Sequence, residues 1–371
     1  MKMLYPILFL LIVIAAQCYT SLRIWQILPL SPLVKTIATG IYNTAFLSLI
    51  LYFFTAMRTG QLISFDFTTV LYEISTSYPF ILLYLVIIFA AVDICKVIHL
   101  IPNGFSHESW IGTAIVSGIM LVTFIGGNIH YYNKYRENIH LSTKKNISKS
   151  LKIVALSDLH LGYHNQRTEF AKWVDMVNAE NPDFILIAGD IIDFSIVPLQ
   201  EQNMAEEFRR ISAPIYACLG NHEYIRGVDD AEKFYTDANI HLLKDESFTL
   251  TEYGVKIIGR DDRSNPDRKS ISELDPSVNS DPLYSILLDH QPFHLEEAET
   301  AGIDFQFSGH THYGQVWPIN YMIDALYECG FGQWRRGDTH YYISSGLGIW
   351  GGKFRIGTRS EYVVVEITKE E

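Results

Sequence analysis

Charged residues are spread very unevenly along this chain, and that feature constrains its fold more than any other. The 371 residues include 29 Lys and Arg and 41 Asp and Glu, and only nine of these precede Lys134. The nine are Lys2, Arg23, Lys35, Arg58, Asp66, Glu73, Asp93, Lys96 and Glu108. An apolar N-terminal part therefore precedes a charged, water-soluble part. The formal net charge of −12 lies almost wholly in the second part, and this argues against nucleic acid as its main partner, because phosphate binding needs a basic surface.

Four apolar runs in the first part approach the roughly 20 residues that a membrane-spanning helix needs. They are about Leu4–Tyr19, Ile37–Met57, Pro79–Ile101 and Trp110–Tyr131, and Tyr and Trp cluster at their ends. The first run is short enough to be a signal peptide, but the Ala-Ala-Gln-Cys that follows offers no small residue at the final cleavage position. We therefore predict an all-α transmembrane region of about four helices over residues 1–132.

An even number of spans places the N-terminus and the soluble part on the same side of the membrane. That side carries Lys2, Arg58, Lys134, Arg136, Lys144, Lys145 and Lys149, whereas the other has Arg23 and Lys35. The positive-inside rule then predicts an integral protein of a bacterial-type inner membrane with its soluble domain in the cytoplasm. Residues 133–150 are interpreted as a basic linker that could also contact anionic lipid headgroups.

Three polar residues, Asp93, Lys96 and His99, recur at helical spacing within the third run. They form either an intramembrane polar site or an i,i+3 ion pair that faces other helices. The second interpretation is favoured, because Lys96 is near enough to the end of the run to reach the interface. The four cysteines include no CxxC pair and predict no disulfide framework, which favours a reducing compartment.

From Leu151 onwards one pattern recurs: a short run of Val, Ile and aromatic residues, a Gly or Ser, and then a potential metal ligand. The runs are Ile153–Leu156, Phe184–Ala188, Ile215–Leu219, Ile286–Leu288 and Phe305–Phe307. Each predicts a buried strand whose C-terminal end delivers a polar side chain. Between the first two, Phe170, Trp173, Val174 and Val177 share one face of an expected helix. Strands that alternate with helices predict an α/β layered core with its site beyond the strand ends.

The polar residues that follow these runs are carboxylates, imidazoles and one Asn amide, without a thiolate. This ligand set suits Mn, Fe or Zn better than a structural zinc site of the cysteine type. His310 and His312 cannot share one helical face, but on a loop at a strand end they can serve two adjacent metals. Two divalent ions roughly 3.5–4 Å apart can hold a bridging hydroxide and neutralise charge on attacking and leaving oxygens, as phosphoester hydrolysis requires.

These residues resemble the calcineurin-like metallophosphoesterases, whose motifs D-x-H, G-D, G-N-H-[DE], H and G-H-x-H occur here in that order. The matching blocks are Asp158-Leu-His160, Gly189-Asp190, Gly220-Asn221-His222-Glu223, His290 and Gly309-His310-Thr-His312. The resemblance extends to about the C-terminus, and it implies a metallophosphoesterase-type β-sandwich flanked by helices over residues 151–371. Gly309–Gln315 and Ser345–Gly348 are similar to the subfamily that carries N-terminal membrane segments.

The resemblance also implies a role for each matching residue. Asp158, His160 and His312 would hold one metal, Asn221, His290 and His310 the other, and Asp190 would bridge the two. His222 would protonate or stabilise the leaving group while a bridging hydroxide attacks phosphorus in line. Glu223 stands where many members carry Asp and could orient His222, and Asp289 could support the ligands from behind.

The substrate is constrained by the membrane anchor and by an apolar segment from Tyr313 to Gly337. This segment is either ordinary core or an apolar lip that enters the membrane interface, with Arg335 and Arg336 reaching phosphate. Arg260, Asp261 and Asp262 are interpreted as a polar loop. The leading expectation is a phosphorylated small molecule or a lipid with a phosphodiester or pyrophosphate bond. The resemblance to the membrane-anchored subfamily implies UDP-2,3-diacylglucosamine as an example. The alternatives are a phosphoprotein phosphatase and a non-catalytic membrane sensor that uses the metal domain for binding.

Overall fold

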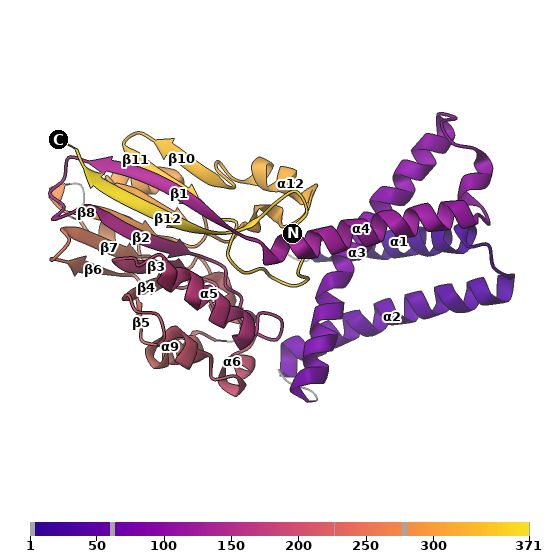
Figure 1. Cartoon of the computed structure of the whole chain (residues 1–371), viewed down its shortest axis with the longest axis horizontal. Helices are drawn as coiled ribbons and strands as arrows, with labels where there is room; N and C mark the ends of the chain where they lie inside the picture. Colours follow the sequence, from indigo (N-terminus) through magenta and orange to yellow (C-terminus); the bar gives the residue numbers. More distant parts are fainter. Residues whose placement is uncertain (1–3, 60–63, 226, 277–279, 371) are drawn as a thin grey trace. The chain divides into compact units, whose positions relative to one another are not determined.

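A computed structural model describes residues 4–59, 64–225, 227–276 and 280–370 (Figure 1). The chain divides into two compact units, residues 1–128 and residues 129–371. Lys2, one of the charges used to predict sidedness, lies outside the described residues.

The first unit is helical. Its elements are α1 (Leu4–Ile27), α2 (Pro32–Thr59), α3 (Phe65–Val97), the 3-10 helix η1 (Asn103–Ser106) and α4 (Trp110–Tyr132), whose last turn belongs to the second unit. Within the described residues, four helices are long and apolar enough to cross a membrane, by length and composition. The prediction of four apolar helices ahead of the soluble domain is confirmed.

Helix α3 begins fourteen residues before the predicted run. It starts at Phe65 and continues through Pro79, where the sequence analysis placed the beginning of the span. The hydroxyls of Ser75 and Thr76 donate to the carbonyl of Tyr72 in the preceding turn, so these polar residues are satisfied inside the helix. Because neighbouring helices and hydroxyl groups compensate for a proline in a membrane helix, Pro79 does not end it.

Asp93 pairs between helices. Its carboxylate accepts a hydrogen bond from Tyr19 and lies 2.5 Å from the guanidinium of Arg23, both on α1. The ion pair expected with Lys96 on the same helix is therefore replaced by a pair that joins α3 to α1. Polar contacts of this kind stabilise helix association in a membrane.

The second unit contains two six-stranded sheets. In order across the first sheet the strands are β1 (Lys134–Thr143), β12 (Ser360–Lys369), β2 (Leu151–Leu156), β3 (Phe184–Ala188), β4 (Ile215–Cys218) and β5 (Ile240–Leu242). In order across the second sheet they are β10 (Gly332–Arg336), β11 (Thr339–Ile343), β9 (Phe305–Ser308), β8 (Tyr284–Leu288), β7 (Val255–Gly259) and β6 (Glu246–Leu250). The runs predicted as strands correspond to β2, β3, β4, β8 and β9.

Strand β1 lies where the sequence analysis predicted only a linker. It pairs in parallel with β12 over ten residues, from Lys134 beside Ser360 to Thr143 beside Lys369. Its inward residues Ile139 and Leu141 are buried in the core between the sheets. The sequence does not predict this strand, because only a few apolar residues alternate along it and exposed residues such as Arg136 and His140 make the segment look basic.

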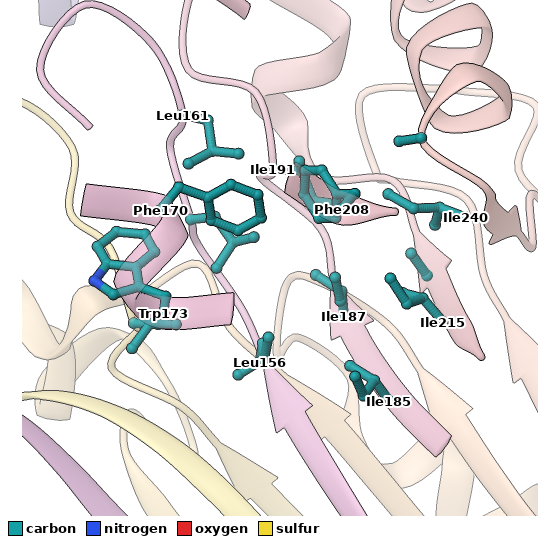
Figure 2. Close-up of a cluster of buried hydrophobic side chains, with 14 of the residues drawn as sticks. Leu156, Leu161, Phe170, Trp173, Ile185, Ile187, Ile191, Phe208, Ile215 and Ile240 are labelled. Carbon is teal, nitrogen blue, oxygen red and sulfur yellow. The ribbon is translucent and has the colours of Figure 1, made fainter. Parts of the chain in front are cut away.

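Buried apolar side chains of the second unit form three clusters, one between the two sheets and one on the outer face of each sheet. Side chains alternate along β3: Phe184 and Leu186 enter the core between the two sheets, whereas Ile185 and Ile187 face helices on the outside. Figure 2 shows this outer cluster, in which Phe170 and Trp173 cover the sheet. The remaining outer layer covers the second sheet. These layers form a helix-flanked β-sandwich, as expected from the sequence.

The helices of this unit are mostly short. They are α5 (Arg167–Ala179), α6 (Val197–Glu201), α7 (Met204–Phe208), α8 (Asn221–Ile225), α9 (Val228–Asp237), α10 (Ile271–Leu274), α11 (Leu295–Ala301), α12 (Ile319–Leu326) and the 3-10 helix η3 (His312–Gly314). The predicted helix between the first two strand runs is α5, and its four apolar residues are buried.

Candidate metal centre

The candidate ligands lie where neighbouring parallel strands end. Asp158 and His160 follow β2, and Asp190 follows β3. Asn221 begins the helix after β4. Strands β2, β3 and β4 are parallel, as are β8 and β9 of the other sheet, so the ends of the strands within each sheet lie side by side. The structure brings all seven candidate ligands together.

One cluster consists of Asp158, His160 and His312. The Nε2 atoms of the two imidazoles are 3.0 Å apart, and His312 Nε2 lies 3.5 Å from Asp158 Oδ1. Two imidazole nitrogens and a carboxylate oxygen that converge in this way form a set of ligand atoms for one cation.

A second cluster consists of Asp190, His290 and His310. His290 Nε2 lies 3.1 Å from Asp190 Oδ2, and His310 Nδ1 lies 2.8 Å from the amide oxygen of Asn221. The other ring nitrogen of His290 is 2.7 Å from the carbonyl of Ala188, which fixes the orientation of the ring.

Asp190 lies between the two clusters. Its Oδ2 is 3.1 Å from His290 Nε2 and 3.7 Å from His160 Nε2. Its Oδ1 accepts a hydrogen bond of 2.9 Å from the backbone N–H of His222. This placement is compatible with the bridging role that the family resemblance implies, and the individual ligand assignments remain predictions.

Three of these groups, His310, His312 and Asp190, are held in the protonation state that a divalent cation needs, whereas neighbouring carboxylates raise the pKa of His290. Burial lowers the pKa of His310 to about 4 and that of His312 well below its usual range, so both rings are neutral at pH 7 and have a free lone pair. Burial acts to raise the pKa of Asp190, but the imidazoles of His290 and His222 hold it well below its usual range. Buried carboxylates this close together need a compensating positive charge, which metal ions would supply.

The backbone at the site is strained, and its glycines allow close contacts. Asp158, His160, Asp190, His310 and His312 all have positive φ, between 43° and 71°. Residues other than glycine adopt this region at a cost, and such residues cluster at functional sites. A Cβ at Gly309 would lie 2.3 Å from Asp158 Oδ2, so the ligand loop can approach Asp158 only with glycine at this position.

Asp193 is a site residue that the sequence analysis missed. Its carboxylate lies 3.3 Å from His160 Nδ1 and 3.5 Å from His222 Nδ1, and its carbonyl lies 3.0 Å from the same His222 nitrogen. It therefore contacts the ring nitrogens on the far side of a candidate ligand and of the candidate proton donor, and fixes both rings. The available signal was a second acid three residues after Asp190, in Gly189-Asp190-Ile-Ile-Asp193.

Glu223 has a different role from the one expected. Its two oxygens accept hydrogen bonds from the backbone N–H groups of Asp190 (3.1 Å), Gly220 (2.8 Å) and Ile192 (3.0 Å). It therefore joins the loops that follow β3 and β4, whereas the orientation of His222 is set by Asp193. The longer side chain of Glu is what lets one carboxylate reach all three groups.

Asp289, Arg335 and Arg336 make contacts other than those expected. Asp289 pairs with Arg260 (3.3 Å) and Arg268 (3.2 Å). Arg260 belongs to the loop that the sequence predicts to be polar, and it is buried. On β10, Arg336 pairs with Glu299 and Glu328, and Arg335 lies 3.5 Å from Asp338. A direct role in substrate binding for the two arginines of β10 stays a prediction.

Arg355 was also missed. It is buried, and it donates hydrogen bonds to the carbonyls of His312 (2.7 Å) and Ser345. A Cβ at Gly346, in the same segment, would lie 2.9 Å from the Cβ of Asp158. The late Ser345–Gly348 motif therefore packs directly against the ligand loops, and Arg355 holds them together.

The last turn of α4 joins the same network within the second unit. The hydroxyl of Tyr131 lies 2.7 Å from both Asn165 Oδ1 and Glu169 Oε1. The amide of Asn165 donates to the carbonyls of Leu159 (3.0 Å) and His160 (3.1 Å). The end of this helix is thus hydrogen-bonded to the loop that carries a candidate ligand.

Buried oxygen and nitrogen ligands on the strand ends of such a sandwich are typical of metal-dependent phosphoesterases. The comparisons agree with this class: residues 151–314 match the family model described as calcineurin-like phosphoesterase. An uncharacterized metallophosphoesterase of Aquifex aeolicus is 32% identical over 227 residues, which cover 58% of this chain and 85% of that protein. The chain belongs to the calcineurin-like metallophosphoesterase family.

Other relatives share the same region. An uncharacterized metallophosphoesterase of Campylobacter jejuni is 31% identical over 229 residues, 60% of each chain. A Bos taurus protein named transmembrane protein with metallophosphoesterase domain is 30% identical over 236 residues, 57% of this chain and 52% of that protein. The chain spans about 60% of the length of the relatives that it matches first. The prediction of the metallophosphoesterase family is confirmed, whereas the catalytic activity, manganese, the number of ions and the substrate remain predictions.

Proposed function

We propose that this chain is a membrane-anchored phosphohydrolase that uses two divalent metal ions to cleave a phosphodiester or pyrophosphate bond. The observation that carries the proposal is the position of Asp190, whose carboxylate lies between a cluster built on Asp158, His160 and His312 and a cluster built on Asn221, His290 and His310. A shared carboxylate between two ligand sets is what a pair of adjacent ions requires.

The mechanism divides between the ions and the chain. When bound, two divalent ions supply Lewis-acid chemistry at the phosphoryl group. The chain fixes their positions through strained loops and close glycine contacts. His222 delivers a proton to the leaving oxygen, and Asp193 holds its Nδ1 side so that Nε2 is directed to the reaction.

We further propose a lipid-linked substrate, with UDP-2,3-diacylglucosamine as the leading example. The four apolar helices support this proposal, because they keep the catalytic unit beside lipid. The positive-inside bias supports a cytoplasmic active site in a bacterial-type inner membrane. Because β1 is paired with β12, we place the start of the catalytic domain at Lys134 rather than at Leu151.

Phosphorus NMR of UDP-2,3-diacylglucosamine with the detergent-purified chain and Mn²⁺ tests the function. A soluble bis-aryl phosphate and the Asp190→Asn variant run in parallel. Release of UMP and a lipid monophosphate, lost in the variant, is the expected result. Cleavage of the soluble diester alone would retain the phosphohydrolase and reject this lipid. Preference for a phosphoprotein monoester would favour a phosphatase, and bound metal without turnover of any substrate would favour the sensor.

A further inference from the structure

Helix α12 carries an apolar surface that the catalytic site does not use. Tyr321, Met322 and Leu326 are 63%, 62% and 68% exposed, and none of the residues of the helix is buried. Met322 and Leu326 are one helical turn apart and share one side of the helix, and the exposed Tyr321 adjoins that side. Ile323 lies on a different side, against Gly330. A cluster of large exposed apolar side chains indicates an interaction surface.

The beginning of α12 is connected to the end of α4 by a short run of contacts inside the second unit. The ammonium of Lys353 lies 5.5 Å from the ring centre of Tyr132, the last residue of α4. Three residues further along, the carbonyl of Ile356 accepts a hydrogen bond of 2.6 Å from the N–H of Trp317, two residues before α12. Three residues of chain span at most about 10 Å, so a short series of direct contacts leads from the end of a membrane-length helix to the beginning of α12.

The composition of the surface identifies the partner. The only charged residue of α12 is Asp324, whose carboxylate accepts a hydrogen bond from Tyr313. Tyr321 on α12 and the exposed Trp317 before it are residue types enriched at the headgroup level of membranes. A short helix with an uncharged apolar side, next to the end of a membrane-spanning helix, matches an interfacial helix.

The surface is also joined to the metal centre at both ends. His312 and η3 precede α12, and the ring of Tyr327, which caps its C-terminal end, lies 6.5 Å from the ring of His310. The hydroxyl of Thr311 donates to the carbonyl of Gly330 beyond the helix. A lipid in contact with α12 would therefore lie beside the ligand loop.

We propose that the exposed side of α12 inserts into the interfacial layer of the same bilayer that α4 spans. The sequence allowed the apolar segment from Tyr313 to Gly337 to be either core or an apolar lip, and it contributes to both. Val316 is fully buried in the core, and Tyr321, Met322 and Leu326 form the lip. The lip holds the catalytic loops at the lipid surface, so that a phosphate carried by a lipid reaches the centre without leaving the membrane. The consequence for lipid substrates rests on the proposed function, whereas the insertion itself does not.

The test uses the full chain in lipid nanodiscs with a bimane label at Met322→Cys. Cys218 and Cys329 are buried, so the label is directed to the introduced thiol once Cys18 and Cys95 are replaced by Ala. The matched control is Phe248→Cys, an exposed apolar position on β6, at the opposite edge of the sheet from β10. Lipids with a spin label near the headgroup should quench the label at 322 at least about threefold more than the label at 248, and aqueous iodide should show the reverse order, since the interfacial layer excludes water-soluble quenchers.

Equal quenching of both labels by iodide, without lipid quenching at 322, would overturn the proposal. Shielding at 322 from both quenchers would also overturn it, because that result indicates a protein partner such as a second copy of the chain. In the unlabelled chain, Met322→Ser with Leu326→Ser should reduce turnover of a lipid substrate about tenfold and leave a soluble diester within twofold, with Phe248→Ser as control. Because quenching requires no turnover, failure of the proposed enzymatic function leaves the insertion test intact.

Discussion

Gly220→Ala tests whether close packing of the strand ends positions Asp190. A Cβ at Gly220 would lie 2.2 Å from Asp190 Oδ1 and 2.5 Å from Asp190 N, whereas Cβ atoms essentially never approach other atoms within 3.0 Å. The carboxylate must therefore move by about 0.8 Å, the difference between the first and last of these distances. Asp190 cannot absorb this shift freely, because His222 N and Glu223 already hold its carboxylate and its backbone.

The expected loss is large because the displaced group lies between both ligand clusters. A misplacement of about 1 Å can reduce an enzyme rate roughly 10²-fold, which corresponds to about 2.7 kcal/mol in the activation barrier. We expect kcat/KM for a soluble bis-aryl phosphate to fall by about this factor, and bound metal, measured by mass spectrometry, to fall as well.

The matched control for this substitution is Gly332→Ala. Gly332 has a positive φ of 85°, unlike Gly220, but no other atom lies within 4 Å of the position that a Cβ would take. The control therefore adds backbone strain that Gly220→Ala lacks and displaces no ligand, and it should keep its activity and metal. If Gly220→Ala retains more than half of the wild-type rate and its full metal content, the geometry argued for Asp190 is wrong.

Three further substitutions probe other parts of the account. Asp193→Asn should lower the rate about 10–100-fold, with the largest losses for poor leaving groups if His222 is the proton donor, as a series of aryl phosphates would reveal. The pKa of Glu180 is lowered to about 2, chiefly by Arg136 on β1. The ionised Glu180 therefore stabilises the fold above pH 4.5, and this stabilisation disappears as the pH falls through 2. The melting temperatures of wild type and Glu180→Gln should differ at pH 7 and converge near pH 2. Tyr131→Phe removes a buried hydroxyl that, within the second unit, joins the last turn of α4 to Asn165 and Glu169, and should lower the free energy of unfolding by about 1–3 kcal/mol in urea titrations.

Each of the three substitutions can be contradicted by a specific result, and two of them have a matched control. Equal losses of Asp193→Asn for all leaving groups would restrict Asp193 to holding His160. Glu246→Gln, at an exposed carboxylate on β6, should leave the melting temperature unchanged, and a difference for Glu180 that persists at pH 2 would contradict the ion-pair account. Tyr135→Phe is the exposed match for Tyr131, and equal stability of the two variants would contradict the network at the end of α4.

The sequence predicted the strands of the site well because each has a local signal. Continuous apolar runs mark strands that are buried on both faces, and β3 coincides with the predicted Phe184–Ala188. The ligands follow these strands immediately, so one-dimensional order was sufficient to bring Asp158, Asp190 and His290 into one hypothesis. The parallel pairing of neighbouring strands then places these ends together.

Other features depend on contacts that have no local signal. Strand β1 is stabilised by β12, more than two hundred residues later in the chain, and only Ile139 and Leu141 mark its buried face. Asp193 differs from many other acids in the sequence only in its position behind two imidazoles. Glu223 was assigned to the nearest functional neighbour, His222, because sequence proximity does not reveal that its oxygens reach the backbone of a different loop.

The most direct test of the central claim is electron paramagnetic resonance of the full chain loaded with Mn²⁺, together with the metal content per chain. The account predicts two ions per chain and an exchange-coupled spectrum, because ions about 3.5–4 Å apart that share Asp190 interact magnetically. Asp190→Asn should lose the coupling and at least one ion. One ion per chain with an uncoupled spectrum in the wild type would contradict the two-metal centre.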